Sequence, residues 1–124
     1  MSYENRIFVV DTWRTEYNST LFPEIIADYS LSRLDYDVNG KVFDQIFDID
    51  VDFELYGDND FELTFDKYGK RIKAAKIQTV IEYLKKYREI HWQRRIAPVI
   101  AMLEVFEKNA DEWNNNLLVV HYGY

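Results

Sequence analysis

The sequence predicts an α+β domain in which a mostly antiparallel sheet is covered on one face by two helices. Three observations support this class: period-two alternation over residues 32–66, helical spacing of apolar residues after Lys70, and an apolar, β-branched segment near each end of the chain. With 124 residues, of which 48% are hydrophobic, residues 1–124 are expected to form a single domain with a substantial core.

The first strand is expected at residues 6–13, where RIFVVDTW is rich in β-branched and aromatic side chains typical of a strand buried on both faces. Residues 21–29 are ambiguous. Pro23 suits the first turn of a short helix, with Thr20 as its cap, but the apolar residues do not settle the type of structure.

A three-stranded antiparallel meander is predicted over residues 32–66. Residues 32–38 alternate strictly and are followed by Asn39-Gly40, a strong hairpin signal because both residues accept a positive φ. The second strand is expected at residues 41–56, bent or bulged near 44–46 because of its length. A turn at 57–60 then leads into the third strand at 61–66.

Alternation along these strands separates an apolar face from an acidic face. The apolar set, which the helices are expected to cover, is Leu34, Tyr36, Val38, Phe47, Ile49, Val51, Phe53, Leu55, Phe61, Leu63 and Phe65. The outward set contains nine carboxylates: Asp35, Asp37, Asp48, Asp50, Asp52, Glu54, Asp60, Glu62 and Asp66. Arg33 is the only basic residue among the outward positions.

Two helical runs are predicted after the meander. The apolar face of the first is Ile77, Val80, Ile81, Leu84, Tyr87 and His91, and that of the second is Val99, Met102, Leu103, Phe106, Ala110 and Trp113. Pro98 lies between them, so the chain forms either one kinked helix or two helices with Pro98 in the first turn of the second. A last strand is expected at residues 117–122.

The acidic face is the candidate functional site. Like charges on neighbouring strands cost up to about 1 kcal/mol per pair, and aspartate is depleted in strands, so this density is locally unfavourable. A regular row of carboxylates resembles the phosphate backbone that nucleic-acid-binding proteins recognise. The hypothesis is therefore a non-catalytic inhibitor that binds a basic nucleic-acid-handling protein, as a phage counter-defence protein (anti-CRISPR or anti-restriction) or as an immunity protein for a nuclease toxin.

Other interpretations of the charge remain open. The acidic face is also consistent with a solvated surface, or with contact to a second copy in an oligomer. Residues 1–66 carry a net charge of −12 and residues 67–95 a net charge of +8, so the basic segment 70–95, with its interleaved aromatics, is the alternative site, for RNA or single-stranded DNA. The total charge of −7 disfavours direct binding of nucleic acid.

Several classes of site find no support in the sequence. The chain has no cysteine and only two histidines, and it lacks the glycine-rich phosphate loop and the nucleophile and zinc motifs, so no enzyme and no cofactor are predicted. The DxDxD of Asp48, Asp50 and Asp52 does not continue as a calcium loop, because Phe53 stands where that loop needs glycine. With no signal peptide and no membrane-spanning run, a cytoplasmic location is expected.

Overall fold

The computed structural model describes residues 5–12, 24–31, 45–51, 53–57, 61–65, 69–90, 96–109 and 117–123. The strands are β1 (Asn5–Asp11), β2 (Glu24–Ser30), β3 (Ile49–Asp50), β4 (Lys73–Ala75) and β5 (Leu117–Gly123), and the helices are α2 (Ile77–Ile90) and α3 (Ile96–Lys108). Within these residues the strands form a five-stranded sheet in the order β2-β1-β5-β4-β3. Neighbouring strands are antiparallel throughout, so the predicted α+β class is confirmed.

The centre of the sheet is the pair β1 and β5. Their register places Phe8 opposite Val120 and Asp11 opposite Leu117. Residues 7–10 of β1 are each at most 1% exposed, which confirms the expectation of a strand buried on both faces. The predicted last strand is confirmed as β5.

The ambiguous segment 21–29 contains a strand. β2 pairs with the outer side of β1, from Arg6 opposite Ser30 to Asp11 opposite Glu24, with a shift of register between Val9 and Val10. Of the alternatives left open for residues 21–29, the short helix is therefore excluded for the described residues 24–29. The physical reason is long-range, because the edge of β1 offers a ladder of hydrogen bonds that a short helix cannot use.

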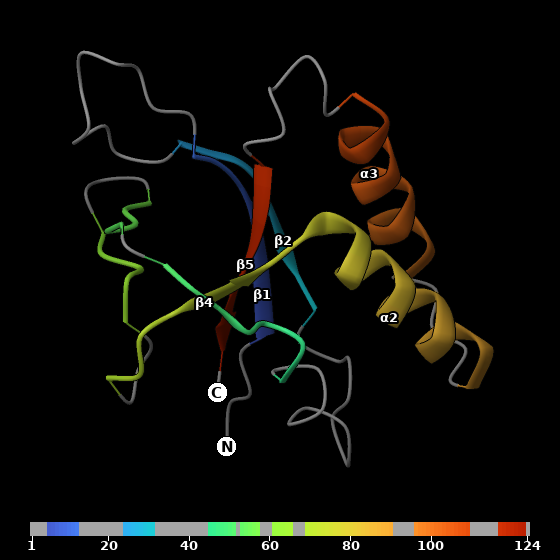
Figure 1. Ribbon diagram of the computed structural model, residues 1–124, viewed down its shortest axis with the longest axis horizontal. Helices are drawn as coiled ribbons and strands as arrows, with labels where there is room; N and C mark the ends of the chain where they lie inside the picture. Colours follow the sequence, from blue (N-terminus) through green and yellow to red (C-terminus); the bar gives the residue numbers. More distant parts are fainter. Residues whose placement is uncertain are drawn as a thin grey trace.

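One face of the sheet is covered by the two helices (Figure 1). The helix-side core lies between the sheet and the helices. It includes Ile7, Val9, Ala75, Val80, Leu84, Val99, Leu103 and Val119. The predicted apolar face of the first helix is buried from Ile77 to Tyr87, and Val99 and Leu103 are buried on the second. His91, Ala110 and Trp113 lie outside the described residues.

The junction at Pro98 is resolved as two helices rather than one kinked helix. Pro98 is the third residue of α3, in the first turn, where backbone N–H groups have no intrahelical acceptor. The prediction of helical structure beginning near Lys70 is wrong for the residues of β4, because Lys73, Ala74 and Ala75 pair with His121, Val120 and Val119 of β5. Neither helix has the length and apolar character needed to cross a membrane.

The opposite face of the sheet is covered by the described residues 51, 53–57, 61–65 and 69–72, which run along the far side from the helices (Figure 1). The loop-side core beneath them consists of Phe8, Val10, Val51, Phe53, Leu55, Leu63, Ile72, Ala74, Val120 and Tyr122. Phe8 and Val10 alternate with Ile7 and Val9 of the helix-side core, which shows that the two cores lie on opposite faces of β1.

Three details of the predicted meander are therefore wrong. The helices do not cover Val51, Phe53, Leu55 and Leu63, which pack on the other face of the sheet. Residues 61–65 form no strand of the sheet, only the isolated bridges Tyr56–Glu62 and Phe65–Arg71. Among the described residues of the second predicted strand, only Ile49–Asp50 belongs to the sheet, as β3. The first predicted strand, residues 32–38, lies outside the described residues.

The predicted inward set is confirmed only in part. Val51, Phe53, Leu55 and Leu63 are buried, but Phe61 is 64% exposed and Phe65 is 44% exposed. The chain bends at Thr64, which is itself fully buried, so strand alternation fails on both sides of Leu63. A short, singly bridged segment does not hold the period-two pattern that a continuous ladder would impose.

Candidate functional site

Four of the nine predicted site residues are described by the structure. Asp48, Asp50, Glu54 and Glu62 are all exposed, as the alternation predicted. The other five lie outside the described residues: Asp35, Asp37, Asp52, Asp60 and Asp66. The structure therefore shows that four carboxylates are exposed and leaves the full nine-residue face a prediction. Asp50 is in register with Lys73, His121 and Ile7, so it points to the helix side of the sheet and does not share a face with Glu54 and Glu62.

Asp50 lies on β3, the edge strand of the sheet, and its register partner on β4 is Lys73. The Lys73 Nζ to Asp50 Oδ1 distance is 3.7 Å, and the Asp50 side chain is 89% exposed. An ion pair this exposed contributes about 0–1 kcal/mol to stability. One predicted site carboxylate is thus partly balanced by a cation of its own chain, whereas no ion pair involves Asp48, Glu54 or Glu62 among the described residues.

Glu54 and Glu62, here called the acidic pair, converge on the ring of Tyr56. Glu62 is the bridge partner of Tyr56, and Glu54 stands two residues before it on the same side of an extended segment. Tyr56 Oη donates a hydrogen bond to Glu54 Oε2 at 2.9 Å. The pKa of Tyr56 is raised above 10.0, first because its hydroxyl donates to Glu54, and further by partial burial and by the charges of both glutamates.

The backbone that carries the acidic pair forms a short antiparallel hairpin, here called the hairpin, in which residues 55–57 lie beside residues 61–63. Leu63 N donates to Leu55 O at 2.7 Å and Gly57 N donates to Phe61 O at 2.8 Å. Thr64 completes it, because its Oγ1 accepts from Leu55 N at 2.8 Å and also lies 3.4 Å from Leu55 O as a donor. A buried hydroxyl thus takes the place of a ladder bond that this irregular hairpin lacks.

Arg71 supports the backbone of Val51 and Phe53, just before the hairpin. Its guanidinium donates to two backbone carbonyls, from Nε to Val51 O at 3.2 Å and from Nη2 to Phe53 O at 3.0 Å. The same group lies 5.6 Å from the ring centre of Phe65. The sequence interpretation placed Arg71 in a basic nucleic-acid-binding segment and missed this role, because bonds to carbonyls distant in sequence leave no local pattern.

The basic segment 70–95 does not form the single helix of the alternative site. Its described cations divide among β4, the residues on either side of β4, and α2. Lys73 pairs with Asp50, Lys85 Nζ lies 3.8 Å from Glu104 Oε1, and Arg71 binds carbonyls on the opposite face of the sheet. The interleaved Tyr83 and Tyr87 stack with ring centres 6.4 Å apart and pack into the helix-side core, so they are not a platform for bases.

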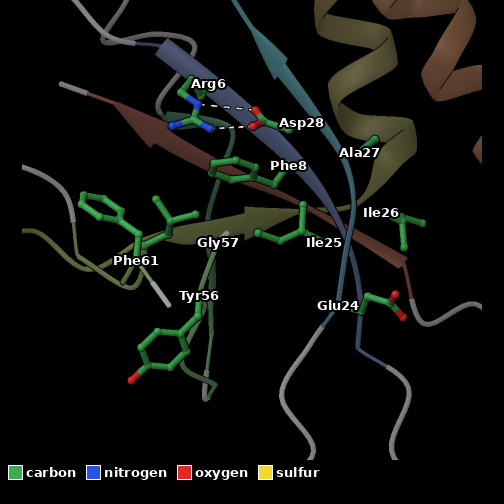
Figure 2. Close-up of a pocket in the computed structure, with 11 residues that line it drawn as sticks. Arg6, Phe8, Glu24, Ile25, Ile26, Ala27, Asp28, Tyr56, Gly57 and Phe61 are labelled. Carbon is green, nitrogen blue, oxygen red and sulfur yellow. Dashed lines mark hydrogen bonds and ion pairs between the residues drawn. The ribbon is translucent and has the colours of Figure 1, made fainter. Parts of the chain in front are cut away.

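A groove of about 750 Å³ lies between β2 and the hairpin that carries the acidic pair (Figure 2). Its apolar lining includes Phe8, Ile25, Phe61 and Leu63. Figure 2 shows Arg6 and Asp28 at one end, joined by hydrogen bonds, and Tyr56 and Glu24 toward the other. Sequence reasoning missed this groove, since it assigned Phe61 to the core and left the structure of residues 21–29 open.

The described residues contain no group of three histidine or acidic side chains placed to hold a metal ion. His121 is buried on β5 and stacks on Phe47, with ring centres 4.9 Å apart. The imidazole therefore packs in the protein interior, away from the acidic pair and the groove.

Comparison with known proteins adds no relative. No protein-family model matches the chain, and no curated protein or solved structure is significantly similar to it. The functional conclusions below therefore rest on the geometry of the acidic pair, its support and the adjoining groove.

Proposed function

We propose that this protein is a non-catalytic inhibitor that binds a basic, nucleic-acid-handling protein through its carboxylate surface. The observation that carries the proposal is the acidic pair. Glu54 and Glu62 are exposed, converge on Tyr56, and have no cationic partner among the described residues. Their backbone is anchored from both sides by Thr64 and Arg71.

A braced carboxylate surface suits a cationic groove for two physical reasons. Preordered charges steer association electrostatically and suffer no further loss of conformational entropy on binding. In addition, residues 1–66 have a net charge of −12, so the predicted outward carboxylates outside the described residues would extend the same negative potential. In a lysine- and arginine-lined site, such a surface would take the place of the phosphate backbone.

The biological setting that fits this binding mode is inhibition of a nuclease or a similar enzyme. A phage-encoded counter-defence protein and an immunity protein for a nuclease toxin both need a stoichiometric, acidic binder. The exposed acids, their support and the net charge of −7 agree with either role.

The proposal is tested by charge reversal. Glu54→Lys with Glu62→Lys is compared with Glu89→Lys with Glu107→Lys, which changes the net charge equally at exposed positions on the helices. Immobilised protein is used to capture partners from a lysate of cells that carry nucleases. The first variant is expected to lose capture about tenfold near 0.1 M salt, and the helix variant to keep it.

Competition separates nucleic-acid mimicry from simple acidity. Duplex DNA or RNA added to the captured complex is expected to release the partner, because both occupy one cationic site. Unchanged capture by the Glu54→Lys, Glu62→Lys variant would show that the acidic pair is not the interface. Capture that depends on the acidic pair but resists nucleic acid would overturn the mimicry and leave an acidic binding protein of another kind.

A further inference from the structure

We propose that the groove between β2 and the hairpin binds an extended segment of the protein partner, one that carries an apolar side chain next to lysine or arginine residues. The inference rests on the proposed function, because the acidic pair supplies the complementary charge. It goes further by assigning the apolar part of the recognition to residues that the carboxylate surface does not include.

The lining of the groove includes large apolar side chains. Phe8 and Leu63 belong to the loop-side core, and Ile25 packs against that core. Phe61 stands beside them, 64% exposed, and Tyr56 is 37% exposed. Exposed aromatic rings next to a concave apolar surface with a polar rim are typical of protein-binding sites, where such rings become the buried anchors.

The two ends of the groove differ in charge. Arg6 makes two hydrogen bonds to Asp28, with Nη2 to Oδ2 at 2.5 Å, and its guanidinium lies 4.9 Å from the ring centre of Phe8. That end is internally balanced. Toward Tyr56 the charges are negative, because Glu24 lines the groove and the acidic pair flanks the Tyr56 ring. A ligand that complements this groove is therefore apolar in its middle part and cationic on the Tyr56 side.

The geometry favours a chain segment over a small molecule. The volume of about 750 Å³ falls within the usual range for ligand sites, about 300–1,000 Å³. Glu54 and Glu62, however, are not among the lining residues, so an occupant must leave the groove to reach them. A single extended segment does both, with an apolar residue inside and a basic residue beyond Tyr56.

The test begins with an unbiased probe. A phage-displayed library of random nine-residue peptides is panned against the intact protein, and selected peptides are titrated into methyl-labelled protein by NMR. Enrichment of an apolar residue flanked by lysine or arginine is expected, with shifts of the Ile25 and Leu63 methyls and none at Ile100 or Leu103 of the helix-side core. No enrichment, or shifts only in the helix-side core, would overturn the proposal.

Two matched phenylalanine variants test the groove itself. Phe61→Ser removes an exposed ring from the groove, whereas Phe65→Ser removes an exposed ring that does not line it. The selected peptide is expected to bind Phe61→Ser at least about tenfold more weakly and Phe65→Ser almost as well as the original protein. Equal affinity for all three proteins would overturn the groove assignment.

The same peptide separates this proposal from the proposed function. If Glu54→Lys with Glu62→Lys abolishes binding while Phe61→Ser leaves it unchanged, the acidic surface binds alone and the groove assignment is wrong. If Phe61→Ser abolishes binding while the double reversal has no effect, the groove binds an apolar segment and the charge assignment is wrong. Methyl shifts at Ile25 and Leu63 that grow with protein concentration without peptide would identify a second copy as the occupant, which also overturns the proposal.

Discussion

The two faces of the sheet are closed in different ways. On the helix side, α2 and α3 present buried residues such as Leu84 and Leu103 at helical intervals, and their backbone groups are satisfied within each helix. On the loop side, the described residues between 51 and 72 cover the sheet, and two isolated bridges pair them. Their backbone groups are satisfied in part by side chains, namely Thr64 and Arg71.

This difference explains why the candidate site lies on the loop side. A regular helix places most of its large apolar side chains in the core, whereas an irregular cover leaves some outside, as Phe61 and Phe65 show. Exposed aromatics, exposed acids and a groove then occur together on one support. Binding residues are commonly carried by irregular segments that a rigid scaffold holds in place, and here that scaffold is the sheet.

The largest expected effect is on the helix side. Leu103→Ala removes a fully buried side chain of α3, so we expect a loss of about 2–5 kcal/mol in the free energy of unfolding, from lost burial and from the cavity that remains. Urea unfolding measures it. Val105→Ala, two residues along the same helix and 59% exposed in the original protein, is the control and should change stability by less than about 0.5 kcal/mol. Equal losses would contradict the assignment of this core.

On the loop side, the sharpest test is Thr64→Val. Valine keeps the shape but leaves the buried Leu55 N–H without its acceptor, so we expect a loss of about 1–3 kcal/mol and faster hydrogen exchange at that amide. Thr64→Ser keeps the hydroxyl and serves as the control. If the valine variant is as stable as the serine variant, the hydroxyl does not hold the hairpin.

A smaller effect is expected from Arg71→Met. The change removes two donors to the Val51 and Phe53 carbonyls, but Arg71 is exposed and water replaces part of what is lost. We therefore expect about 1 kcal/mol in urea unfolding, with faster hydrogen exchange over residues 53–57. Lys76→Met removes an exposed cation at the start of α2 and is the matched control. Equal exchange in the two variants would show that Arg71 does not brace the hairpin.

The smallest effect is a change in titration. Because Glu54 is the main cause of the raised Tyr56 pKa, Glu54→Gln should lower that pKa toward 10.0, and Glu62→Gln should lower it less. The Tyr56–Glu54 hydrogen bond is intact below pH 10.0 and is lost as the pH rises through the raised pKa. Tyrosinate absorbance is measured against Tyr56→Phe. A Tyr56 pKa that neither variant lowers would show that the acidic pair does not converge on this ring.

Part of the site was also readable from the sequence. The exposure of Asp48, Asp50, Glu54 and Glu62 followed from alternation with buried neighbours such as Phe53 and Leu55. What the alternation could not provide was the partner of each group. Lys73 reaches Asp50 because β3 and β4 are in register, although 23 positions of sequence separate the two residues. The groove likewise needs β2 and the hairpin together, which no local pattern encodes.

The sequence by itself determined which segments have an apolar side and with what period. β1 and β5 each contain a short apolar run with β-branched residues, and the apolar residues of α2 and α3 repeat every three or four positions, so local sterics and burial already favour these structures. Only the tertiary structure decided that residues 24–30 and 73–75 become strands, that Val51, Phe53, Leu55 and Leu63 cover the face away from the helices, and that Phe61 is exposed. The reason is that a sheet has two faces and free edges, and which segment occupies each depends on long-range pairing that no single segment specifies.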